Sequence, residues 1–277
     1  MEIVLAAAAA CVYGFGDFCG GRASREADSF TVTFIGQIFS VLILGVALIV
    51  LADPVAPSRD WMWGAAGGIG GFVGLSMFYF ALAKGSMTVV APTTAVVSAV
   101  VPAAAGIGFG ERPSMVAYVG VLVAIIGIAL VTGAVGAAHA PTPRRIMMIA
   151  VLGGCGFGWM FVCLDRTSED SGMWPLLAAR IASISIAAVV IGARRTGLVR
   201  RVPALALWAG LFDMGANVLF LLANREGLLT LVSVITALYP VSTIVLAMRL
   251  DHERATRSQA VGMVCAGLAL TLVAVGR

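Results

Sequence analysis

Charged residues are scarce in this chain. Asp, Glu, Lys and Arg make up only 12% of the 277 residues, whereas 60% are hydrophobic, and the mean hydropathy is +1.02. A soluble domain carries about 25% charged residues, so this chain has too few charges to cover a surface exposed to water. The composition therefore disfavours a soluble enzyme, a nucleic-acid-binding protein, a disordered chain and a coiled coil.

The apolar segments do not alternate apolar and polar residues as the strands of a transmembrane β-barrel would, so a β-barrel is also disfavoured. Continuous apolar runs are present instead, and a helix needs about 20 apolar residues to cross a bilayer. We therefore predict an all-α membrane protein with ten transmembrane helices. These helices are expected near 3–21, 30–51, 61–82, 88–109, 115–135, 146–164, 173–193, 203–223, 228–248 and 259–276. No basic segment precedes the first run, so we expect a retained span rather than a cleaved signal peptide.

Motifs for catalysis, nucleotide binding and metal binding are lacking. The glycine-rich third span has no Gly-Lys-Ser/Thr sequence after it, so it is not a phosphate-binding loop. The two histidines, His139 and His252, are isolated, and the five cysteines form no Cys-x-x-Cys pair. No Ser-His-Asp or Cys-His pattern is apparent. The sequence therefore predicts a non-enzymatic protein with no cofactor and no metal site.

An internal repeat relates the two halves of the chain. Gly14-Phe15-Gly16 reappears as Gly156-Phe157-Gly158, an offset of 142 residues. The same offset aligns Asp28 with Asp170, Phe78 with Phe220, Gly85 with Gly227, Thr94 with Thr236 and Glu111-Arg112 with Glu253-Arg254. We therefore predict one five-helix repeat over 1–136, a proline-containing connector over 137–145 and a second five-helix repeat over 146–277.

Because five is an odd number of spans, the second repeat must enter the membrane in the opposite sense to the first. Such inverted-topology repeats are typical of secondary transporters that work by alternating access, with the binding site between the halves. The loops on the side of residues 22–28 carry 12 basic residues and the opposite loops carry 5. By the positive-inside rule, this count places both termini outside the cytoplasm.

The turns before the fifth and tenth spans resemble those of a known family. Gly110-Glu111-Arg112 precedes the fifth span and Glu253-Arg254 the tenth, although His252 departs from the usual glycine. With ten spans in a five-plus-five repeat, the chain resembles the EamA-type transporters of the drug/metabolite transporter superfamily. The resemblance implies transport of small metabolites or drugs without ATP. It also implies cytoplasmic termini, opposite to the loop-charge count.

Ionisable side chains inside spans are costly and mark functional candidates. Arg180 lies within the seventh span and needs a counter-charge or an anionic ligand, and Asp213 in the eighth span or Asp17 in the first could serve. An Arg–Asp pair that opens for a substrate carboxylate would bind substrate, whereas a permanent pair would be structural. We take Arg180, Asp213 and its i+4 neighbour Asn217 as candidate substrate-binding residues.

Further candidates surround this group. Asp213 and then Asp17 are the candidate proton-coupling residues, and Trp159 and Tyr239 are candidate apolar walls. Because Asp17 lies near the end of its span, an interfacial acid that reaches water or pairs with Arg22 or Arg25 is the favoured alternative for it. Pro240 predicts a kink in the ninth span because it frees a carbonyl one turn earlier. The six glycines between Gly64 and Gly74 predict close helix packing in the third span.

The sequence as a whole predicts a secondary transporter of small organic solutes, such as amino-acid-like metabolites or drugs. Arg supplies every cationic side chain except Lys84, as is typical of GC-rich bacterial genomes, so we expect the bacterial plasma membrane. The expected partners are a small-molecule substrate and the lipid bilayer, with protons as candidate coupling ion and no nucleic acid. The alternative is a non-transporting scaffold or sensor subunit. Substrate, direction of transport and oligomeric state stay open.

Overall fold

The computed structural model describes residues 1–51, 55–85, 87–131, 143–194, 204–250 and 257–276, and its regular secondary structure there is all helical. The first half contains α1 (Glu2–Glu26), α2 (Ser29–Leu51), α3 (Ser58–Lys84), α4 (Met87–Gly108) and α5 (Met115–Val131). The second half contains α6 (Arg144–Asp165), the short 3₁₀ helix η1 (Glu169–Ser171), α7 (Trp174–Arg194), α8 (Ala204–Glu226), α9 (Leu229–Thr236), α10 (Tyr239–Leu250) and α11 (Arg257–Val275).

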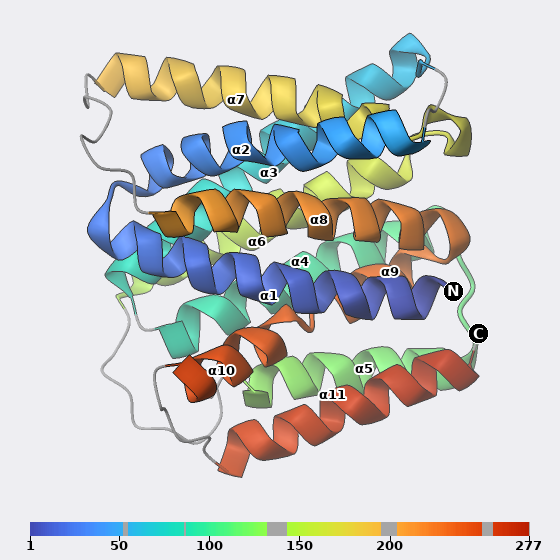
Figure 1. Ribbon diagram of the computed structural model, residues 1–277. Helices are drawn as coiled ribbons and strands as arrows, with labels where there is room; N and C mark the ends of the chain where they lie inside the picture. The colour runs from blue at the N-terminus through green and yellow to red at the C-terminus, as the bar shows by residue number, and fades with distance from the viewer. Residues whose placement is uncertain (52–54, 86, 132–142, 195–203, 251–256, 277) are drawn as a thin grey trace.

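The helices pack into a bundle (Figure 1). Six of them, α1, α2, α3, α6, α7 and α8, are long and apolar enough to cross a membrane, and four shorter apolar stretches lie at the fourth, fifth, ninth and tenth spans. The predicted all-helical, multi-pass membrane architecture is therefore confirmed. The predicted connector over 137–145 lies mostly outside the described residues.

The ninth span is not one helix. It ends as α9 at Thr236, turns through Ala237 and Leu238, and resumes as α10 at Tyr239. Pro240 stands in the first turn of the new helix, where its missing N–H costs no helical hydrogen bond. The predicted kink is thus a break between two helices.

The two halves are related by a pseudo-two-fold arrangement. At the offset of 142 residues, α1 corresponds to α6, α2 to α7, α3 to α8, α4 to the α9–α10 pair and α5 to α11. The packing pairs follow this exchange: α1 packs on α8 as α6 does on α3, α2 packs on α8 as α7 does on α3, and α5 packs on α11. In Figure 1, α1 starts at the end of the bundle where α6 finishes, so the repeats are inverted.

Glycine permits the closest of these crossings. A Cβ at Gly68 would overlap the backbone of Ala179 where α3 crosses α7. Its repeat mate, Gly210, would overlap the backbone of Gly36 where α8 crosses α2. The predicted close packing of the third span is therefore confirmed, and the same device recurs at the symmetry-related crossing.

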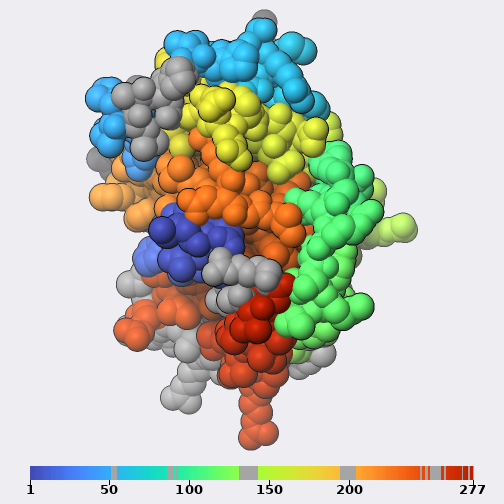
Figure 2. All heavy atoms as spheres, turned by 90° about the vertical axis from the view of Figure 1, so that its right-hand side faces the viewer, coloured from blue at the N-terminus to red at the C-terminus, as the bar shows by residue number. Residues whose placement is uncertain are grey.

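Polar contacts tie the repeats together at the end that carries both termini. Figure 2 looks onto this end and shows the start of α3 against the segment between α6 and α7. There the Asp60 carboxylate accepts hydrogen bonds from the Ser168 amide (3.0 Å) and from the hydroxyls of Ser168 and Ser171. Repeat one is thereby linked to repeat two through a single buried carboxylate.

Glu111 makes a second link at this end. Its carboxylate accepts hydrogen bonds from the amides of Leu229 (2.7 Å) and Thr230 (2.9 Å), which lie at the start of α9. A carboxylate at this position accepts hydrogen bonds from N–H groups that have no partner within the helix, and its negative charge interacts favourably with the positive end of the helix dipole. The preceding Gly110 has a φ of 105°, in the left-handed region that favours glycine. The equivalent Glu253-Arg254 turn lies outside the described residues.

Candidate functional site

An ion pair lies inside the second repeat. Arg180 of α7 and Asp213 of α8 are 8% and 9% exposed, and the Arg180 Nη2 atom lies 2.5 Å from the Asp213 Oδ2 atom. A buried pair is stable only while both partners are present, because either one alone would be an uncompensated buried charge. Of the two counter-charges that the sequence offered for Arg180, the structure selects Asp213.

The Arg180 guanidinium has further hydrogen-bonding capacity. It carries five N–H donors, and Asp213 is the one hydrogen-bond partner that the described residues give it. Arg180 also lines a small cavity with Gln37, Ser183 and Asn217. Donors of the arginine are therefore left for another acceptor on the cavity side.

Two amides and a hydroxyl complete the surroundings of Arg180. The Ser183 hydroxyl of α7 donates to the Gln37 Oε1 atom of α2, joining the two repeats. The Asn217 Nδ2 atom donates to the Asp213 carbonyl of its own helix (2.7 Å), and Asn217 is 2% exposed. Asn217 thus stands beside the ion pair as expected, but its amide N–H bonds to the backbone rather than to a neighbouring helix.

A second polar group lies on the other side of Asp213. One cavity is lined by Asp213, Asp17 and Tyr13 of α1, and Tyr239 of α10, among apolar and aromatic residues. Asp17 is 8% exposed and has no hydrogen-bond or ion-pair partner among the described residues. The hydroxyls of Tyr13 and Tyr239 are buried and also lack partners there. Buried polar groups are normally paired, so this cluster has unused capacity for a ligand or a proton.

The expectation of an interfacial Asp17 that reaches water or pairs with Arg22 or Arg25 is wrong. The structure instead buries Asp17 nine residues before the end of the 25-residue helix α1. The reason is that α1 continues past the apolar run to Glu26, so Asp17 lies deeper than the run suggested. Asp17 therefore belongs to the interior cluster.

These cavities are small. The cavity at Asp17 has a volume of about 20 Å³, and the cavities at Arg180 and at Asp213 have about 10 Å³ each. About 10–15 Å³ suffices for one water molecule. A solute the size of an amino acid does not fit, so the structure holds this site in a closed form.

Trp159 lies apart from the site. Its indole N–H donates to the Ala66 carbonyl of α3 (3.2 Å), and the side chain is 46% exposed. Trp159 lines none of the three small cavities, because α6 turns this position toward the outside of its crossing with α3. Tyr239, the other candidate wall, does line the Asp17 cavity, and its ring packs against Phe78 with centroids 6.4 Å apart.

Gln37 and Tyr13 were missed by the sequence analysis. Gln37 is 2% exposed and stands within an apolar run, which is the signal that could have identified it. Tyr13 gives no such signal, because an aromatic side chain in an apolar span also fits a purely packing role. No group of three potential metal ligands occurs among the described residues.

Comparisons with known proteins agree with this architecture. A family model described as the EamA-like transporter family matches residues 1–133 and 144–275. No curated protein matches the chain. One solved crystal structure superposes with a TM-score of 0.75 at 15% identity, covering 99% of this chain and 96% of the other. At that identity the likeness concerns the fold alone.

Proposed function

We propose that this chain, which belongs to the EamA-like transporter family, carries small organic solutes with an anionic group across the bacterial plasma membrane by alternating access. Family membership indicates transmembrane transport of small solutes, and the family is one of transporters rather than of enzymes. The inverted repeats support the mechanism, since two symmetry-related halves can exchange shapes at similar energy.

One observation carries the proposal: the buried Arg180–Asp213 pair with spare arginine donors facing a cavity. A substrate carboxylate would bind the guanidinium in two parallel hydrogen bonds, for which arginine is the best-suited side chain. The substrate carboxylate would either replace Asp213 as the partner of Arg180 or bind the guanidinium together with it. We therefore assign Arg180 to the anionic group of the solute and Asp213 to the role of its resting partner, with Asn217 beside them and Tyr239 as a wall.

We assign the coupling proton to Asp17 ahead of Asp213. Burying an unpaired charge costs far more than burying a paired one. Asp213 has Arg180 as its partner, whereas Asp17 has none among the described residues. Asp17 is thus the acid that we expect to bind a proton while the site is closed, and to release it when the site opens to water.

The test uses purified protein in liposomes. A thermal-shift screen of amino acids and small carboxylates first identifies a solute that binds, and uptake of that solute is then measured with and without an imposed proton gradient. We expect Asp17→Asn to lose gradient-driven uptake while keeping exchange of labelled for unlabelled solute. We expect Asp213→Asn to reduce both, because Arg180 loses its partner.

Glu26→Gln is the matched control, since Glu26 is an exposed acid at the end of the same helix. Its uptake should equal that of the unaltered protein. Unchanged gradient-driven uptake in Asp17→Asn would remove Asp17 from coupling. A protein that binds no solute in the screen and exchanges none would instead favour the scaffold or sensor subunit.

A further inference from the structure

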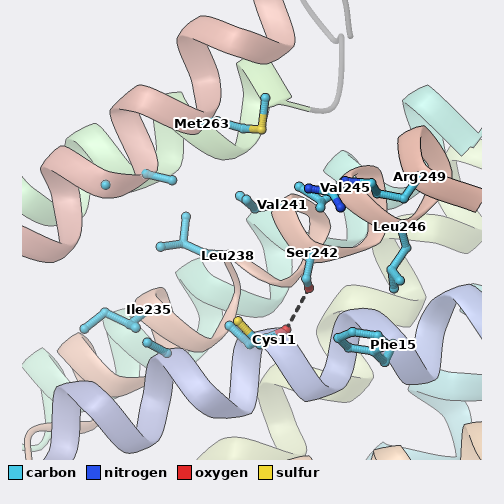
Figure 3. A pocket seen from close by; sticks show the side chains of 14 residues that line it. Cys11, Phe15, Ile235, Leu238, Val241, Ser242, Val245, Leu246, Arg249 and Met263 are labelled. Carbon is cyan, nitrogen blue, oxygen red and sulfur yellow. Dashed lines mark hydrogen bonds between the residues drawn. The ribbon is translucent and has the colours of Figure 1, made fainter. Parts of the chain in front are cut away.

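A large apolar cavity shares no lining residue with the cavities of the candidate transport site. It has a volume of about 510 Å³ and is formed by α1, α9, α10 and α11 (Figure 3). Small-molecule sites in proteins range from about 300 to 1,000 Å³. The space is therefore large enough for a substantial ligand, in contrast to the water-sized cavities around Asp17 and Arg180.

The cavity follows from the break in the ninth span. After the break, α10 packs on α1, while α11 packs on α5. In the first repeat the corresponding helices α4 and α5 are in contact, but α10 and α11 make no comparable contact among the described residues. The second repeat thus departs from the symmetry of the first, and a gap is left between α10 and α11.

The walls are apolar and offer almost no hydrogen bonds. Ala10, Ile235, Leu238 and Ala266 form a buried floor, with 1–6% exposure. The one hydroxyl, that of Ser242, already lies within hydrogen-bond distance of the carbonyls of Tyr239 (2.8 Å) and Ala10 (3.2 Å). A polar solute would have to give up its hydration here without replacement, which is unfavourable.

The rim opens to the outer surface of the bundle. Cys11 is exposed, and Phe15 and Val245 are 41% and 40% exposed. In a membrane protein such an apolar outer surface faces lipid. A lipid acyl chain can therefore enter this cavity from the side without crossing water.

One cation stands at the rim. Arg249 is exposed, lines the cavity and has no carboxylate partner among the described residues. Figure 3 shows Arg249 on the same helix, α10, as the rim residue Val245. Arg249 lies at the end of the bundle opposite the two termini. The exposed Arg257, at the start of α11, lies at the same end. Arginines near the ends of membrane helices reach the headgroup level.

We propose that this cavity binds one anionic phospholipid, with an acyl chain between α10 and α11 and the headgroup phosphate on Arg249. The apolar floor recognises the acyl chain and the Arg249 guanidinium recognises the negative charge. An anionic leaflet supplies such lipids wherever a basic protein surface meets it. This site is separate from the Arg180–Asp213 site and does not depend on the proposed transport function.

Lipid binding is measured by native mass spectrometry of the purified full chain with dioleoyl phosphatidylglycerol, which is anionic, and dioleoyl phosphatidylcholine, which is zwitterionic. Two variants target the site. Arg249→Gln removes the charge, and Gly267→Phe fills the cavity. Gly267 lines the cavity, and a Cβ there would meet nothing within 4 Å, so the larger side chain has room. Arg145→Gln is the matched control, an exposed arginine in the first turn of α6.

We expect one phosphatidylglycerol to bind more tightly than phosphatidylcholine. Arg249→Gln should weaken phosphatidylglycerol binding by about tenfold, as for loss of one charge-assisted hydrogen bond. Gly267→Phe should abolish it, and Arg145→Gln should leave it unchanged, with all melting temperatures retained.

Several results would overturn the proposal. One is equal affinity for the two lipids. Another is full binding to Gly267→Phe, which would place the lipid elsewhere on the surface. Glycerol phosphate binding as tightly as the lipid would show that the apolar cavity is not used, and oleate displacing the lipid at lower concentration would assign the cavity to a free fatty acid.

Discussion

The buried Arg180–Asp213 pair gives a prediction that can be worked out quantitatively. Replacing one member of a buried pair costs about 3–5 kcal/mol, because the other charge is left without compensation. Replacing both by uncharged residues of similar size is often neutral or stabilising. The 2.5 Å contact and the exposures of 8% and 9% place this pair in the buried class.

We therefore expect Arg180→Met and Asp213→Asn to destabilise the protein singly, and the double variant to recover most of that loss. At about 2–4 °C per kcal/mol for domains of 150–250 residues, each single change should lower the melting temperature by about 6–20 °C. Thermal unfolding in detergent, followed by circular dichroism, measures all four proteins. The control Arg145→Met should stay within about 0.5 kcal/mol of the parent, as surface substitutions usually do.

Additive losses in the double variant would refute the reasoning, since additivity means that the two side chains do not interact. Losses below about 1 kcal/mol in both single variants would also refute it, because they would place the pair among solvent-exposed ion pairs. The double variant also separates stability from function. It should fold but bind no carboxylate solute, since the guanidinium is gone.

Three further predictions concern the contacts between the repeats. Gly210→Ala should destabilise the protein by about 1–3 kcal/mol, because the added Cβ would overlap the backbone at a helix crossing. Gly45→Ala, which has open space around it, is the control and should not destabilise it in the same thermal unfolding measurement. Asp60→Ala should remove its hydrogen bonds to the α6–α7 segment and speed amide hydrogen exchange of residues 168–173 relative to the parent; unchanged exchange would contradict this. Glu111→Ala should lower stability by about 0.5–2 kcal/mol through loss of the α9 cap, and Glu111→Gln, which keeps one acceptor, should lower it less.

Much of the fold could be predicted from the sequence because hydropathy and the repeat are encoded along the chain. The apolar runs gave the spans, the offset of 142 residues gave the inverted halves, and Pro240 marked the break in the ninth span. Each of these signals depends only on neighbouring residues or on a fixed spacing. The number and order of the spans can therefore be predicted without knowing how each helix is rotated about its axis.

The site was predictable only in part. Arg180 and Asp213 stand out because a charge in an apolar span needs a partner, and the structure brings them together. Trp159 and Gln37 could not be placed, because a helix that is apolar on all sides gives no sign of which face lies inward. Asp17 was assigned to the interface for a related reason: the length of an apolar run does not fix where its helix ends.

The measurement that tests the central claim most directly is counterflow in proteoliposomes. Vesicles holding the purified chain are loaded with an unlabelled solute that binds in the thermal-shift screen, and uptake of the labelled solute is followed. An alternating-access carrier exchanges solute for solute, so our account predicts labelled uptake that rises transiently above equilibrium and disappears in Arg180→Met. Labelled uptake that only approaches equilibrium, whatever the internal solute, would contradict alternating access.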